Sequence, residues 1–454
     1  MNRIASRAMA LLLVAALLAG GFVFFLVEYF AKGDDWVISS GSPHVYNGGN
    51  IGCGIVVDRH NTMLLNMNEG RTYTQSIPLR QATVHWLGDR YGSISAPALP
   101  HYAKELAGFD AINGVYSYGQ VGGIAELTLS GAVQTAALEA MGDYKGTVAV
   151  YNYKTGELLC AVTTPTYDPN DVPQFTEGDE AYEGLYVNRF TQSSYIPGSI
   201  FKIVTLAAAL EEDPDIVNQR FTCSGSYKVG SEEITCEDAH WGQSLKEAFR
   251  NSCNCAFAQI GLQLGAETLQ KYVDKFGIVQ PVTFDGITTQ AGNFKVIGEA
   301  DLNVGWSSIG QYLDLVNPCS FLTFMGAIAN EGKTTNPYLV ERISVNGITT
   351  YDAKRTGGER ILSQETTKIL REYLVNNVEN KYGADNFPGY TVGAKTGTGE
   401  VDGGKKPNAM LAGFADSEDL PLAFIVCVED AGYGRAVCVP IASKVLSAIQ
   451  QALQ

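Results

Sequence analysis

The sequence predicts an α+β domain whose sheet joins parts of the chain that lie far apart in sequence. Strand patterns occur in a hairpin-like stretch over 146–162 and in three runs, separated by turn residues, over 391–428. Helical patterns fill the middle of the chain from 199 to 275, and a closing helix is expected over 436–453. A single sheet must therefore bring 146–162 beside 391–428.

Composition narrows the class of protein. The 454 residues include 48 acidic and 32 basic side chains, so the formal net charge is −16. Such an acidic chain lacks the basic surface of a nucleic-acid-binding protein. Hydrophobic residues make up 45% of the chain, which is ample for a packed core. The five histidines form no HExxH or HxxxH pair, which argues against a zinc hydrolase.

The N-terminus predicts a membrane anchor. Ala8–Val27 is an uncharged, apolar run that reaches the length needed to cross a bilayer. Because Arg3 and Arg7 precede it, we expect a cytoplasmic N-terminus and an extracellular domain after about residue 32. A cleaved signal peptide is the alternative, since small residues end the first part of the run. The apolar sequence continues through Phe22–Val27, which favours an uncleaved, single-pass anchor in the cell membrane.

Three segments are expected. Residues 1–32 form a short cytoplasmic tail and the anchor. The stretch 33–124 is irregular and rich in Gly, Ser and Tyr, with short apolar runs at Ile55–Val57 and Thr83–Leu87. We interpret it as a loosely packed, strand-containing pedestal module without chemistry of its own. The composition changes near Leu127, so 125–454 is expected to be the main folded unit.

The elements of this unit follow from local patterns. A helix with a possible Ser130 cap is expected over 129–138. Strands over 146–151 and 157–162 flank the turn Lys154-Thr155-Gly156. The remaining elements are expected as helices over 199–211, 244–250 and within 254–275, strands over 391–400, 409–415 and 422–428, and a helix over 436–453.

Three short motifs carry the chemistry: SxxK at 199–202, SxN at 252–254 and KTGT at 395–398. Residues i and i+3 share one helix face, so Ser199 and Lys202 can touch. A serine hydroxyl needs an adjacent base, and a lysine serves only if its pKa falls from about 10.4. Burial and a neighbouring cation both lower a lysine pKa, and Lys395 could be that cation. The helix N-terminus at Ser199 also favours a developing oxyanion.

Each motif alone has a structural explanation. SxxK could be a capped helix start, SxN a turn between helices, and KTGT the end of a surface strand. The chain contains a second KTG at Lys154-Thr155-Gly156, which precedes the serine and occupies a hairpin turn. We interpret that copy as structural. The KTG at Lys395 lies in an apolar strand pattern after the other two motifs.

Together and in this order, the motifs resemble those of class B penicillin-binding proteins, which are membrane-anchored D,D-transpeptidases. The similarity extends to Gly146–Pro169, Val187-Asn188-Arg189, Ile309-Gly310-Gln311 and 327–332. The resemblance implies the penicillin-binding serine transpeptidase fold. That fold is an antiparallel sheet flanked by helices, with a helical subdomain, a small N-terminal pedestal and one transmembrane helix.

The resemblance also implies roles for single residues. The expected site consists of catalytic Ser199, Lys202 and Ser252 and of substrate-binding Asn254, Lys395, Thr396, Gly397 and Thr398. Ser199 is the acylated nucleophile, Lys202 is its base, and the backbone N–H groups of Ser199 and Thr398 form the oxyanion hole. No metal or organic cofactor is implied.

The function implied is cross-linking of peptidoglycan stem peptides through a serine acyl-enzyme that β-lactam antibiotics inhibit. A multi-spanning membrane glycosyltransferase is the expected partner. A D,D-carboxypeptidase or β-lactamase-like hydrolase and a non-enzymatic β-lactam sensor or scaffold remain alternatives. The pedestal and anchor argue against the first, and the intact motifs argue against the second. Ile200 and Asn408–Leu411 depart from the family pattern beside the site, which puts substrate shape and β-lactam affinity in doubt.

The nine cysteines are odd in number. Cys223 and Cys236 bracket a short hairpin-like segment, and a hairpin would bring them within disulfide reach. A disulfide can persist outside the membrane, and this pairing is the expectation. Two alternatives stay open. Both thiols could be free, or Cys223, Cys236 and His240 could bind zinc with Cys253 or Cys255.

Overall fold

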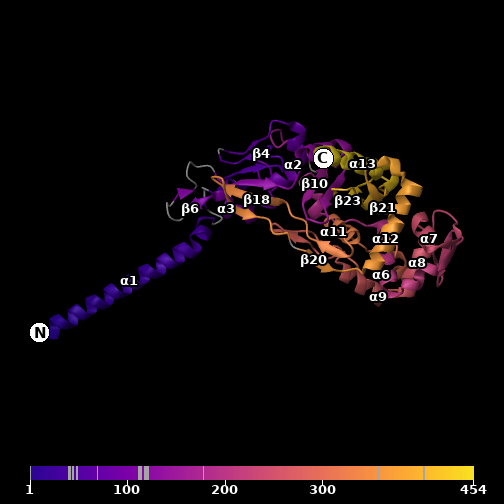
Figure 1. The fold of residues 1–454 in the computed structure, drawn as a ribbon, viewed down its shortest axis with the longest axis horizontal. Coiled ribbons are helices and arrows are strands. Elements are labelled where there is room, and N and C mark those ends of the chain that lie inside the picture. Colours follow the sequence, from indigo (N-terminus) through magenta and orange to yellow (C-terminus); the bar gives the residue numbers. More distant parts are fainter. Residues whose placement is uncertain are drawn as a thin grey trace.

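The computed structural model describes residues 2–38, 42, 45–47, 50–68, 70–110, 115–116, 122–176, 178–355, 357–401 and 404–453. Helix α1 (Asn2–Val37) leads away from the folded part of the chain, with the N-terminus at its far end (Figure 1). Large apolar side chains along it, such as Leu12 and Phe24, are about two-thirds exposed at 67% and 66%. Such a helix suits a lipid environment, and Arg3–Gly33 is a candidate membrane span.

The second long apolar helix, α13 (Gly434–Leu453), has a different environment. Its Val445 and Ile449 side chains are fully buried in the folded domain. We therefore assign α13 to the protein core, and the expected anchor corresponds to α1.

The N-terminal module is built around a mixed sheet of six strands in the order β19-β18-β8-β3-β4-β5, in which only β3 and β8 are parallel. Its elements are β1 (Tyr46–Asn47), β2 (Asn50–Ile51), β3 (Ile55–Val57), β4 (Met63–Asn66), β5 (Thr72–Tyr73), α2 (Ile77–Leu87), η1 (Leu99–Tyr102), α3 (Ala103–Ala107), β6 (Phe109–Asp110), β7 (Val115–Tyr116), β8 (Ile124–Leu127), β18 (Val340–Val345) and β19 (Ile348–Asp352). Strands β18 and β19, and all of β8 except Ile124, therefore come from the stretch 125–454, which we expected to form the main unit.

The expectation of a loosely packed module is wrong. Thr83–Leu87 belongs to helix α2, which Ser76 caps by accepting a hydrogen bond from the Leu79 N–H and in which Pro78 stands in the first turn. Trp86 is buried, and its Nε1 donates to the Ala161 carbonyl at 2.7 Å. The module therefore packs directly against the domain that follows it.

The main sheet has five antiparallel strands in the order β10-β9-β23-β22-β21. They are β9 (Gly146–Asn152), β10 (Leu158–Thr164), β21 (Thr391–Gly399), β22 (Asn408–Asp416) and β23 (Pro421–Val428). The pairing of β9 with β23 confirms that the sheet joins 146–162 to 391–428. Helices cover both faces, as the α+β expectation requires.

The strands of this sheet alternate their side chains between two cores. Val148 and Val150 pack with α4 (Gly131–Met141) and α13, whereas Ala149 and Tyr151 belong to the core on the other face. That second core includes the buried helices α6 (Lys202–Glu212) and α11 (Pro318–Ala329). Helix α12 (Gln364–Asn377) packs beside β21 on this side.

The helical part completes the domain at the β21 edge of the sheet (Figure 1). Its further elements are η2 (Glu180–Tyr182), α5 (Arg189–Gln192), η3 (Gly198–Phe201), η4 (Pro214–Asn218), β11 (Arg220–Cys223), β12 (Ser226–Val229), β13 (Glu232–Thr235), β14 (Trp241–Ser244), α7 (Leu245–Asn251), α8 (Asn254–Leu264), α9 (Ala266–Phe276), β15 (Thr283–Phe284), β16 (Ile287–Thr288), α10 (Asp301–Ser307), β17 (Lys333–Thr335), β20 (Gly357–Arg360), η5 (Val378–Tyr382) and η6 (Ala384–Asn386). The start of α6, the α7–α8 connection and strand β21 meet here.

Candidate active site

The first motif begins on a 3₁₀ turn. Ser199 lies in η3, and the α-helix expected from this residue starts three residues later, at Lys202. Side chains at i and i+3 eclipse one another in a 3₁₀ helix, so Ser199 and Lys202 meet directly. The distance from Lys202 Nζ to Ser199 Oγ is 2.8 Å. Ser199 is half-buried, whereas Lys202 is fully buried.

Two glycines allow strand β21 to lie against this turn. Gly198 has φ +52°, and a Cβ there would lie 2.2 Å from the Thr398 carbonyl oxygen. A Cβ on Gly397 would lie 2.6 Å from the Pro197 carbonyl oxygen. Both positions therefore require glycine. The contact brings the KTGT strand beside Ser199, as the resemblance implied.

The second motif occupies the connection between α7 and α8. Ser252 ends α7 in the left-handed conformation with φ +57°. Its Oγ accepts a hydrogen bond from Lys395 Nζ at 2.9 Å and lies 3.3 Å from Lys202 Nζ. Asn254, the first residue of α8, accepts from Lys202 Nζ through Oδ1 at 2.7 Å. The motif thus touches both lysines.

The two lysines share a buried, low-dielectric environment. Burial lowers the pKa of Lys202 to about 8. Burial, and to a smaller extent repulsion from Lys202, lowers the pKa of Lys395 well below its usual value. We expected Lys395 to be the cation that lowers the pKa of Lys202. The two buried amines repel each other, and Lys381, a cation that the sequence analysis missed, also lowers the pKa of Lys202.

The acceptors around Lys202 fit a neutral amine. A neutral amine offers two N–H groups and one lone pair. The Ser252 carbonyl oxygen, at 2.9 Å, and Asn254 Oδ1 can only accept hydrogen bonds, so they take the two N–H groups. Ser199 Oγ carries a proton and can donate it. In the neutral state, the lone pair of Lys202 is therefore left for the Ser199 hydroxyl, 2.8 Å away, which is the arrangement of a base and its nucleophile.

Strand β21 is held from both sides. Tyr382 Oη accepts a hydrogen bond from the Thr396 N–H at 3.1 Å and lies 3.1 Å from Thr396 Oγ1. Gln311 Nε2 donates to the Thr398 carbonyl oxygen at 2.9 Å. Gln311 lies in a stretch that carried the family resemblance, whereas Tyr382 and Lys381, in the π-helix η5, had no recognisable signal in the sequence.

These residues line a cleft of about 550 Å³. Its wall includes Ser199, Ser252, Asn254, Thr396 and Thr398 together with Thr235, Cys236, Glu237, Asp238, His240, Asn251, Ile309, Gln311, Lys381, Glu400, Tyr433, Gly434 and Arg435. Lys202, Lys395 and Gly397 lie behind this wall, buried. The structure therefore brings all eight expected site residues together.

Two further expectations have different outcomes. The second KTG lies in the turn between β9 and β10, where Lys154 Nζ donates to Asn330 Oδ1 at 2.8 Å, so its structural interpretation is confirmed. The expected disulfide is wrong, since Cys223 and Cys236 are both free thiols. Of the three states considered from the sequence, free thiols and a metal site therefore remain.

Comparison with known proteins agrees with this geometry. The family model described as penicillin binding protein transpeptidase domain matches residues 146–447. The peptidoglycan D,D-transpeptidase PbpA of Mycolicibacterium smegmatis is 30% identical over 359 residues, which is 72% of each chain. Stage V sporulation protein D of Bacillus subtilis is 30% identical over 347 residues, 71% of this chain and 52% of the relative.

Solved structures extend the agreement to the fold. The penicillin G acyl-enzyme complex of penicillin-binding protein A from M. tuberculosis is 25% identical and has a TM-score of 0.73. The match covers 88% of this chain and 99% of that one. The chain therefore belongs to the penicillin-binding protein transpeptidase family, and both the predicted fold and the class B resemblance are confirmed.

The lowered pKa of Lys202 predicts a pH dependence. Only the neutral amine can accept the Ser199 proton, so acylation should rise about tenfold per pH unit below pH 8 and level off above it. The second-order rate of labelling by a fluorescent penicillin, measured from pH 6 to pH 9.5, checks this. A rate that stays flat across this range would contradict the assignment of Lys202 as the base.

Proposed function

We propose that this protein cross-links peptidoglycan as a class B D,D-transpeptidase, with Ser199 as the acylated residue. The observation that carries the proposal is the contact of Lys202 Nζ with Ser199 Oγ, Ser252 and Asn254 in one cleft. Family membership and relatives named as peptidoglycan D,D-transpeptidases support it.

The reaction follows from these positions. Ser199 Oγ attacks the carbonyl carbon between the two terminal D-Ala residues of a stem peptide, and its proton passes to Lys202 Nζ. The D-Ala–D-Ala amide bond breaks, and the departing D-Ala amine takes up a proton through Lys202 and Ser252. The amine of a second stem peptide then attacks the acyl-enzyme, which forms the cross-link and frees Ser199.

The remaining motif residues bind substrate in this proposal. Lys395 and the hydroxyls of Thr396 and Thr398 hold the terminal carboxylate, and Asn254 grips the peptide amide. The backbone N–H groups of Ser199 and Thr398 stabilise the oxyanion. The close approach of β21 to the turn before Ser199 supports this pairing.

We further propose that α1 anchors the protein with its N-terminus in the cytoplasm and residues 33–454 outside the membrane. Arg3 and Arg7 at the start of the apolar helix support this orientation. A multi-spanning membrane glycosyltransferase, which would make the glycan strands that this enzyme cross-links, is the proposed partner.

Labelling tests the assignment of the nucleophile and base. Ser199→Ala should abolish covalent modification by a fluorescent penicillin because it removes the hydroxyl that Lys202 would activate. Lys202→Ala should slow it by about 10²- to 10⁴-fold, the usual contribution of a general base. Intact-mass spectrometry and gel fluorescence measure both. Labelling of either variant at the wild-type rate would contradict the corresponding assignment.

The two KTG sequences provide a matched pair of variants. Lys395→Ala removes a buried amine and a proposed carboxylate contact, so labelling should fall about 10- to 100-fold. Lys154→Ala removes the same side chain from the hairpin turn and should leave the labelling rate unchanged. Equal effects of the two substitutions would contradict the substrate-binding role of Lys395.

The orientation predicts protease access. In wall-stripped cells, an added protease should degrade the folded domain, whereas an epitope tag placed before Arg3 should stay protected until the membrane is permeabilised. Digestion of the tag in intact cells, with survival of the domain, would reverse the proposed topology. A cytoplasmic protein of the host serves as the control for membrane integrity.

A further inference from the structure

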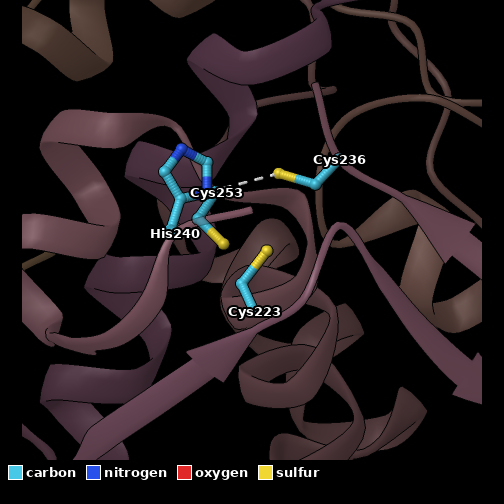
Figure 2. Close-up of side chains that lie close together, drawn as sticks. All are labelled: Cys223, Cys236, His240 and Cys253. Atoms are coloured by element: carbon cyan, nitrogen blue, oxygen red, sulfur yellow. Dashed lines mark hydrogen bonds between the residues drawn. The ribbon is translucent and has the colours of Figure 1, made fainter. Parts of the chain in front are cut away.

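One wall of the active-site cleft contains a cluster of four potential metal ligands. Cys223 ends β11, Cys236 follows β13, His240 precedes β14, and Cys253 caps α8. Their ligand atoms, three Sγ and one imidazole nitrogen, all lie within 4.8 Å of one another. Figure 2 shows the three sulfur atoms facing one another beside the His240 ring.

We propose that these four residues bind a structural zinc ion. Three thiolates and one imidazole form a ligand set that structural zinc sites use, and they complete a closed tetrahedron. Soft sulfur ligands exclude magnesium and calcium, which require oxygen. With zinc bonds of about 2.3 Å to sulfur and 2.1 Å to nitrogen, neighbouring ligands should lie about 3.6 Å apart. Cys236 Sγ and His240 Nδ1 are 3.6 Å apart.

The surroundings of the cluster support thiolate ligands. The Asn254 N–H donates to Cys236 Sγ, and the Ala256 N–H donates to Cys253 Sγ, each at 3.4 Å. Backbone donors of this kind orient metal-bound sulfur and stabilise its charge. Cys223 and Cys253 are buried, whereas Cys236 and His240 are half-buried and line the cleft. Zinc can therefore enter from the cleft.

The zinc would position the second motif. Cys253 stands between Ser252 and Asn254, whose side chains contact Lys202 and Lys395. Ser252 is held in the left-handed conformation, which is unfavourable for a residue with a Cβ and persists only when its surroundings fix it. Asn254 Nδ2 also donates to the Thr235 carbonyl oxygen at 2.9 Å, next to Cys236. The ion ties this wall of the cleft to α8.

Metal analysis tests the site. The full chain, purified in detergent with a tag that lacks histidine, should contain one zinc ion per chain by mass spectrometry. His240→Gln and Cys223→Ser should lose it, whereas Cys319→Ala, which removes a buried thiol of α11 outside the cluster, should keep it. Cobalt exchange into the unmodified protein should give thiolate-to-cobalt absorption, which requires no variant to fold.

Several results would overturn the site: a zinc-free chain that takes up no cobalt, zinc retained by His240→Gln, or a Cys223–Cys236 disulfide found by non-reducing peptide mapping.

The proposal that zinc positions the second motif rests on the proposed transpeptidase site. Removal of zinc by a chelator should slow penicillin labelling at least about tenfold, and zinc but not calcium should restore it. Unchanged labelling of zinc-free protein would overturn that role, whereas absence of labelling with zinc bound would instead contradict the proposed function.

Discussion

The active site depends on the burial of two lysine side chains in one place. Lys202 and Lys395 approach the same Ser252 Oγ, at 3.3 and 2.9 Å, and both are withdrawn from water. Two buried ammonium groups this close repel each other strongly, so the site favours a state in which at least one amine is neutral. A neutral Lys202 can accept a proton from Ser199. The unfavourable free energy of burying two positive charges is therefore what makes a neutral lysine base available.

The surrounding fold keeps these lysines buried. Lys202 belongs to α6, which packs in the core on one face of the main sheet, and Lys395 belongs to the edge strand β21 of that sheet. The glycines Gly198 and Gly397 let strand and helix approach so closely that no side chain separates them. A larger residue at either position would open the space that excludes water from both amines. Backbone packing therefore controls the proton affinity of the side chains.

Local sequence predicted the parts of this site that depend on neighbours in the chain. The i, i+3 spacing of Ser199 and Lys202, the hairpin turn at Lys154 and the period-two strand pattern of β21 are all short-range signals. The contact of Lys381 with the site arises from tertiary packing of η5, and nothing in its own neighbourhood indicated it. The run Thr83–Leu87 received no element from the sequence, because a short apolar run can belong to a strand or a helix, and the structure places it in α2. The cap at Ser76 would have decided between them.

The cysteine residues show more clearly what local sequence cannot predict. From the sequence, a hairpin predicts Cys223 and Cys236 as disulfide partners, and the position of Cys253 inside a catalytic motif argues against its use as a metal ligand. In the structure, the residues of the tripeptide Ser252-Cys253-Asn254 lie in two different environments, so both roles are compatible. Ser252 and Asn254 direct their oxygen atoms at the lysines, whereas Cys253 is buried among the other sulfur atoms and caps α8. The second motif therefore couples the wall of the cleft to the position of Lys202. Apart from Ser199, the hydrogen-bond partners of Lys202 Nζ among the described residues all belong to that motif.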